Sequence, residues 1–293
     1  MTLEDLIYKR LTEDEALAKL LARFNGTPAI AYQTAPQDED RGWDGKRQYP
    51  RMDYIVDMQA NPERGSSGVL TINIWCDEKG HPPEDIEPVV RAALQDILIK
   101  PDGSYPYNLG WARTDAFEQT RSLSGKQTLV IGATVLFDVF AFPTQETTDP
   151  DPIVAINERI KSWASEALVI GKDDLEPFTI PTARSPIFYF RLAAIQSQRE
   201  TNTVAWMDGT IAGHIIAPEE SRLQWLKALV DSLTQDGEVT MMDTSPMFLT
   251  SIKADSTASP IVTGQLRLAV RFGILRRTNY AHPMADITKK GAV

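Results

Sequence analysis

The chain has 293 residues, enough for two domains of ordinary size, and its 42% hydrophobic and 24% charged residues are typical of a soluble globular protein. Its formal net charge is −10, and residues 1–148 carry 15 Lys and Arg against 23 Asp and Glu. This balance argues against general nucleic-acid binding, which depends on neutralising phosphates. One cysteine, Cys76, excludes an intramolecular disulfide, and together with three histidines it cannot supply a zinc cluster. We therefore expect Cys76 to be a buried small hydrophobe.

The chain shows no targeting or membrane signal. No run approaches the roughly 18 apolar residues that a membrane-spanning helix needs. The first residues are acidic where a secretory signal would be basic. We expect no membrane contact and a protein made in the cytoplasm.

The first half predicts an opening helix, two strands, a second helix and a long strand pair. Apolar residues recur at helical spacing between Leu3 and Leu21, and Thr12 with Glu15 predicts a capping box that restarts the helix. The later predicted elements are strands at 53–58 and 70–75, a helix from about Pro83, and long strands at 111–121 and 127–142 joined by a turn at 123–126.

The second half repeats this order. Its predicted elements are a helix at 155–160, strands at 185–190 and 204–216, a helix at 218–233, and strands at 246–254 and 261–275. A polar, proline-punctuated segment at 144–152 separates the halves, as expected of an interdomain hinge.

Four segments of the two halves match in the same order. They are 6–11 with 155–160, 49–54 with 185–190, 83–98 with 218–233, and 132–142 with 264–274, at offsets of 149, 136, 135 and 132. The second helix is preceded by Gly80-His81 in one half and Gly213-His214 in the other, so we expect each histidine in the turn that enters this helix. Such steadily falling offsets favour a tandem duplication.

These elements predict an α+β fold: two tandem copies of a small sandwich, each with an antiparallel or mixed sheet and helices packed on one face. We place the first domain at 1–146, a linker at 147–151, the second, diverged copy at 152–280, and a C-terminal tail at 281–293.

No catalytic, cofactor-binding or metal-ligating motif is present. The run Ser124-Gly125-Lys126 resembles the end of a phosphate loop, but the upstream glycine is missing and the run joins two strands. The acidic run 38–40 with Asp44 fits no calcium loop. We expect no catalytic residue, no cofactor and no metal.

Two segments are candidate protein–protein interfaces instead. The first is the polar loop 36–48, in which Trp43 lies among charges and glycines. Trp and Arg dominate interface hot spots, although Trp43 can equally fold back on its own domain. The second is the basic run after the last strand, a tail or an arm that docks on an acidic neighbour. The candidate interface residues are Arg41, Trp43, Lys46, Arg47, Arg276, Arg277 and Tyr280.

The first half resembles the tail terminator (tail completion) proteins of long-tailed bacteriophages. The resemblance rests on a short opening helix, the strand opener Tyr49-Pro50, the strand 71–75 that ends in Trp75, the helix at 83–98 and two long final strands. The second half departs from the pattern, with Ser185 in place of the tyrosine and a less regular third strand.

The resemblance implies a structural virion protein, assembled in the host cytoplasm, that forms a ring at the head-proximal end of the tail. The implied partners are other copies of the chain in a hexamer or trimer, the tail tube protein, a head–tail connector or neck protein, and the tail sheath where one exists. DNA would pass through the acidic lumen without specific binding.

Three alternatives stay open at this stage. The chain can be another neck, tube or baseplate component. It can be an enzyme that uses a cleft between the copies, with His81, His214 and the acidic loop as its groups. It can also be a host adaptor that binds small molecules, which requires a large apolar pocket.

Overall fold

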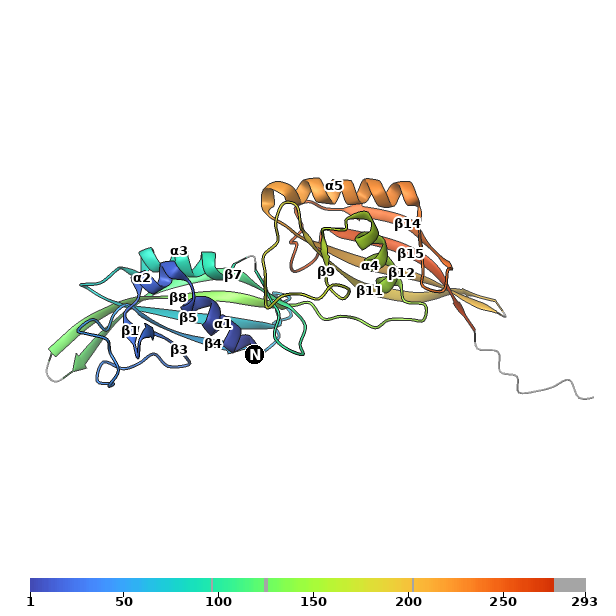
Figure 1. Ribbon diagram of the computed structural model, residues 1–293. Coiled ribbons are helices and arrows are strands. Elements are labelled where there is room, and N and C mark those ends of the chain that lie inside the picture. Colours follow the sequence, from blue (N-terminus) through green and yellow to red (C-terminus); the bar gives the residue numbers. More distant parts are fainter. Residues whose placement is uncertain (96, 124–125, 202, 277–293) are drawn as a thin grey trace, which may run out of the picture.

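The computed structural model describes residues 1–95, 97–123, 126–201 and 203–276. The chain has a mixed α+β fold with more strand than helix. Two large sheets lie end to end in an elongated molecule (Figure 1). We call residues 1–142 and 152–276 the first and second units. No helix of the described residues is both long enough and apolar enough to cross a membrane.

The first sheet has seven strands in the order β10-β6-β7-β8-β5-β4-β3, and all neighbours are antiparallel except β3 and β4. A separate hairpin pairs β1 with β2. The strands of the first unit are β1 (Arg23–Phe24), β2 (Thr27–Pro28), β3 (Ile30–Tyr32), β4 (Arg51–Asp57), β5 (Gly68–Asp77), β6 (Leu98–Ile99), β7 (Tyr107–Leu123) and β8 (Lys126–Ala141).

Helices α1 (Leu3–Thr12), α2 (Glu15–Leu20) and α3 (Pro83–Leu94) cover one face of this sheet (Figure 1). The capping box lies at the start of α1, where Thr2 and Asp5 exchange side-chain and backbone hydrogen bonds. The predicted box at Thr12 and Glu15 is therefore wrong. Thr12 ends α1 and donates its hydroxyl to the Tyr8 carbonyl. Asp14 caps α2 instead, by accepting from two backbone N–H groups.

Alternation along the strands builds the first core. In β5, Leu70, Ile72, Ile74 and Cys76 are fully buried on the helix side, while the residues between them are partly exposed. They meet Ile86, Val90 and other apolar residues of the helices. Cys76 is buried as predicted, and burial raises the pKa of its thiol to about 12.

The second sheet has six strands in the order β13-β14-β15-β12-β11-β9, and all neighbours are antiparallel except β9 and β11. Helices α4 (Pro152–Trp163) and α5 (Glu219–Asp236) pack on it. The strands of the second unit, of which β10 belongs to the first sheet, are β9 (Leu168–Val169), β10 (Phe178–Thr179), β11 (Ile187–Glu200), β12 (Val204–Ile216), β13 (Glu238–Thr240), β14 (Pro246–Ala254) and β15 (Leu266–Leu275). The last strand begins five residues later than the predicted 261, because residues 255–265 form a loop.

The junction between the units is a shared apolar cluster. Strand β10 leaves the second unit and pairs with β6 at the edge of the first sheet. Behind it, Phe142 from the end of β8 packs edge-on against Tyr189 of β11, with ring centroids 5.1 Å apart. The segment between the units is also held, since Tyr189 donates to the Pro143 carbonyl and Gln145 accepts from the Leu192 amide. The cluster consists of Leu98, Phe140, Phe142, Ile170, Leu175, Ile187, Tyr189 and Ile216.

We expect Phe142→Ala to lower the free energy of unfolding by about 3–5 kcal/mol, because it leaves a cavity in this cluster. Amide hydrogen exchange shows which strands lose protection, and exchange should rise in β9 and β11 of the second sheet as well as in β10 of the first. Phe137→Ala is the control, since Phe137 is equally buried but lies inside the first core. It should raise exchange in the first sheet and leave β9 and β11 protected. The same exchange pattern in both variants would contradict a coupling role for Phe142.

Candidate functional site

The loop around Trp43 is held against its own unit. Trp43 forms an isolated bridge with Phe24 of β1, and their rings meet edge-on at 5.2 Å between centroids. The indole N–H donates to the Gln37 carbonyl at 2.9 Å. The sequence left open whether Trp43 contacts a partner or packs on its own domain. In the structure its half-buried ring packs on its own unit.

A buried arginine ties this loop to the sheet. Arg51, the first residue of β4, is 1% exposed, and its Nη1 lies 2.6 Å from an Asp38 carboxylate oxygen. Nη2 donates to the Tyr49 hydroxyl. The guanidinium also lies 4.5 Å from the Tyr49 ring centroid and 5.7 Å from that of Trp43. Among the described residues its Nε has no hydrogen-bond partner. The sequence predicted no role for Arg51.

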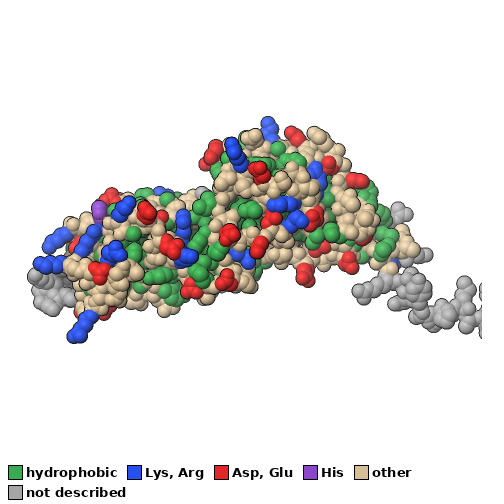
Figure 2. Space-filling model, in the orientation of Figure 1, with side chains coloured by type: hydrophobic (Ala, Val, Ile, Leu, Met, Phe, Trp, Pro, Cys, Tyr) green, Lys and Arg blue, Asp and Glu red, His purple; other side chains and the backbone are tan. Residues whose placement is uncertain are grey.

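The other candidate residues of the loop divide into two kinds. Arg47 donates to the carbonyls of Leu20 and Tyr49, so its charge closes the loop on its own unit. Arg41 and Lys46 are exposed and remain candidates for contact with a partner. This face carries several Lys and Arg side chains at the end of the first unit that holds β1 and the β7–β8 hairpin (Figure 2).

The carboxylates of Asp38, Asp40 and Asp44 are bonded to backbone amides or to Arg51. Asp40 accepts from the Gln37 amide and Asp44 from the Gly26 amide. Within the described ranges, no group of three or more His, Cys, Asp or Glu residues could hold a metal ion.

The second candidate segment begins at the far end of the second unit. Arg276 follows β15, is exposed, and donates through its backbone and its Nη1 to the carbonyls of Thr203 and Thr201. Arg277, Tyr280 and the predicted tail 281–293 lie outside the described residues, as do Ser124 and Gly125.

The groups of the enzyme hypothesis lie in different surroundings. His81 precedes α3 as predicted, half-exposed, with Nδ1 3.6 Å from Asp85. His214 does not lie in the turn before α5, because β12 continues to Ile216 and carries it inside the strand. The Asp38 carboxylate is paired with Arg51. The structure therefore does not assemble these three groups into one site.

His214 is a buried neutral histidine at the junction. Its Nδ1 lies 3.0 Å from the Pro260 carbonyl, which it can only contact as a donor, and its Nε2 accepts from Arg191 at 3.4 Å. Burial, reinforced by Arg191 and Arg267, lowers its pKa to about 4. Its ring packs against those of Tyr189 and Phe142, with ring centroids 5.3 and 6.1 Å away.

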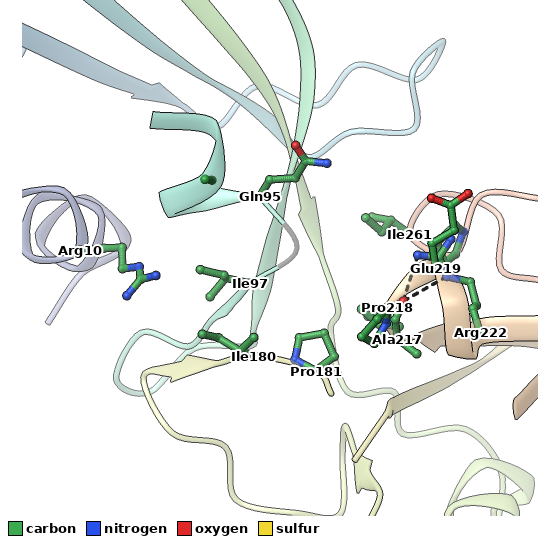
Figure 3. A pocket seen from close by; sticks show the side chains of 13 residues that line it. Arg10, Gln95, Ile97, Ile180, Pro181, Ala217, Pro218, Glu219, Arg222 and Ile261 are labelled. Carbon is green, nitrogen blue, oxygen red and sulfur yellow. Dashed lines mark hydrogen bonds between the residues drawn. The ribbon is translucent and has the colours of Figure 1, made fainter. Parts of the chain in front are cut away.

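A cavity of about 570 Å³ opens between the units. Arg10 reaches it from α1 on one side, and Glu219 with Arg222 reaches it from the start of α5 on the other (Figure 3). Both arginines are already engaged, Arg10 with the Ala93 carbonyl and Arg222 with the Ala217 carbonyl. The remaining wall is mostly Ala, Ile and Pro. Among the described residues, the lining combines this apolar wall with the two engaged arginines, Gln95 and Glu219, and it contains no Ser, Thr, Cys or His.

Comparisons with known proteins identify no relative of the chain. No protein-family model, no curated protein and no solved structure matches the chain.

We expect Arg51→Met to lower the free energy of unfolding by about 3 kcal/mol, because it leaves the Asp38 carboxylate without its buried partner. Arg64→Met is the matched control, since Arg64 makes a 3.0 Å ion pair with Asp138 but is 44% exposed. Its loss should cost less than about 1 kcal/mol. Chemical denaturation measures both values, and equal effects would contradict a special role for the buried pair.

The low pKa of His214 predicts a pH dependence of stability. An unfolded histidine takes up its proton near pH 6.5, whereas the folded one does so near pH 4. Stability is therefore full above pH 6.5 and falls by up to about 3 kcal/mol as the pH drops toward 4. Denaturation between pH 7 and 4.5 should show a shallower loss for His214→Gln than for the wild type. The exposed His81→Gln variant should follow the wild type, and a wild-type slope in His214→Gln would refute the assignment.

Proposed function

We propose that the two units descend from a tandem duplication. Both contain an opening helix, a short strand parallel to the next one, a second helix and a final antiparallel pair. The strand order β6-β7-β8-β5-β4-β3 of the first sheet corresponds to β13-β14-β15-β12-β11-β9 of the second. This identical order of six strands is the main support for duplication.

Register supports the same correspondence. Met52 lies opposite Ile74 in the first unit, and Phe188 lies opposite Ile215 in the second, with all four side chains in the cores. Met52 and Phe188 are 136 residues apart, which is the offset that the sequence match gave for this strand.

For the final strand, the register gives an offset one residue smaller than the sequence match did. Phe137 lies opposite Leu70, and Leu268 lies opposite Ile211, so the equivalent of Leu268 is Phe137 at an offset of 131. The sequence match used 132 and aligned Leu268 with Leu136, which points away from the core. A slip of one residue exchanges the two faces of a strand, and burial decides between them.

We infer that the chain is a structural protein of a bacteriophage tail, of the tail terminator kind. The observation that carries this proposal is the element order: helix, strands, helix and two long final strands occur in each unit, and this is the order on which the resemblance rests. In this function the chain is a virion protein that ends tube growth and joins the tail to the head connector. A tail sheath is a further partner where the tail has one. Another neck, tube or baseplate component is the alternative within the same class.

The shape of the molecule supports assembly into a ring. The β7–β8 hairpin extends at the end of the first unit, and β11, β12 and β15 extend at the far end of the second (Figure 1). Because these two ends differ, contact between them is heterologous, and a heterologous contact whose rotation closes on itself gives a ring. We favour six chains over three. The excess of acid in the first half would let DNA pass without sticking.

The proposal predicts that the purified chain forms hexamers, or trimers, by light scattering coupled to size exclusion. Negative-stain micrographs should show rings, and these rings should bind the end of purified tail tubes and stop their growth. A chain that remains monomeric, alone and with tube protein, would overturn the ring and the terminator function together.

A further inference from the structure

A groove runs beside α3 on the helix side of the first sheet. It has a volume of about 400 Å³. Its floor is made of small residues of the β7–β8 pair, with Ala116 opposite Ala133. One wall is Trp111, which is 42% exposed and stacks on the Arg91 guanidinium at 4.6 Å. Pro83 and Glu84 form the other end.

Of the two glutamates along this groove, Glu87 is bonded to neighbouring side chains and Glu84 makes no ion pair among the described residues. Glu87 is bound to Arg91 at 2.9 Å and accepts the Thr114 hydroxyl, so it is part of the wall. Glu84, in the first turn of α3, is exposed and makes no ion pair within the part of the chain that the structure describes. The groove therefore offers an apolar floor with a carboxylate at its rim.

Among the described residues of the second unit, the final strand pair is too short to form this floor. Pairing of β14 with β15 stops at Ala254 and Leu266. These two residues correspond to Thr114 and Val135 of the first unit, because β15 pairs with β12 in the register in which β8 pairs with β5. Ala116 and Ala133 lie beyond that point. Within the described parts of both units, the groove thus lies on the strand pair that extends further in the first unit.

The far end of the second unit offers the complementary group. Leu275, the last residue of β15, is 73% exposed, the highest value among the exposed large hydrophobic residues described. It pairs with Val204, and Arg276 follows it. An exposed apolar side chain followed by a cation fits an apolar floor with a carboxylate at its rim.

We propose that the groove beside α3 receives the far end of the second unit of another copy of the chain, with Leu275 on the Ala116–Ala133 floor and Arg276 near Glu84. This inference rests on the proposed ring function and names the contact that builds it. The occupant is a second copy because β15 ends at the opposite end of the molecule from α3 (Figure 1). Repetition of the contact around an axis closes the ring.

Cysteine cross-linking tests the contact directly. Cys76 is the one native cysteine, and its buried thiol, with a pKa of about 12, leaves introduced cysteines as the reactive ones. A mixture of Glu84→Cys and Arg276→Cys chains, treated with a short bismaleimide, should give a covalent dimer that neither chain gives alone. A chain with both substitutions should give a ladder up to the ring size. Glu84→Cys mixed with Leu223→Cys is the control, since Leu223 is 54% exposed on α5 and outside the groove.

Association measures the contact independently. Leu275→Ser should raise the dissociation constant of the oligomer about tenfold or more, because a Leu side chain loses its buried position. Leu223→Ser should leave it unchanged.

The outcomes separate this contact from the ring itself. This contact would be overturned, and the ring proposal would stand, if the oligomer forms without the Glu84–Arg276 cross-link and Leu275→Ser leaves its dissociation constant unchanged. A link within a single chain would also overturn it. A wild-type chain that is monomeric under all conditions would overturn both proposals.

Discussion

The arrangement of the whole molecule depends on the apolar cluster where the two sheets meet. Phe142 directly follows β8, the last strand of the first unit, and Tyr189 belongs to β11 of the second unit, so their contact fixes one unit against the other. Strand β10 reinforces it by crossing to the first sheet. Inter-domain linkers that are polar and rich in proline normally allow motion. Here Pro143 and Gln145, just before the linker, are hydrogen-bonded to β11, and the two units present their outer ends in a fixed relation.

A fixed relation matters because the units differ most at those ends. Their cores follow one plan, in which the second helix and the opening helix cover the same face of equivalent strands. The differences lie in the loop 33–50, the β7–β8 extension and the β11–β12 extension. Core positions are constrained by packing, whereas surface extensions change at little cost to stability. Under the proposed duplication, divergence of this kind would give one chain two unlike contact surfaces, which the proposed heterologous assembly requires.

The sequence predicted elements well and their tertiary partners less well. Helices and long strands were predictable because apolar residues repeat at spacings of 3.6 and 2. His214 was misplaced, since a Gly-His pair before a helix has the same local appearance in a turn and at the end of a strand. Strand β10 is two residues long, and nothing local indicates that its partner is β6 of the other unit. Arg51 was missed because its burial depends on Asp38, which lies 13 residues earlier along the chain. No local signal marked it, because β4 also contains Asp53 and Asp57.

The buried Arg51–Asp38 pair also changes what the Trp43 loop can contribute to assembly. A loop held only by its own backbone would lose entropy on binding a partner, and that loss opposes association. Arg51 lies between the rings of Tyr49 and Trp43 and bonds Asp38, so the loop is already ordered in the single chain. Trp43 then acts as a support for the surface that Arg41 and Lys46 present, and the exposed cations become the candidates for contact. The Trp43 loop thus combines an ordered scaffold with exposed cations, and a contact made through Arg41 and Lys46 would need no further ordering of this loop.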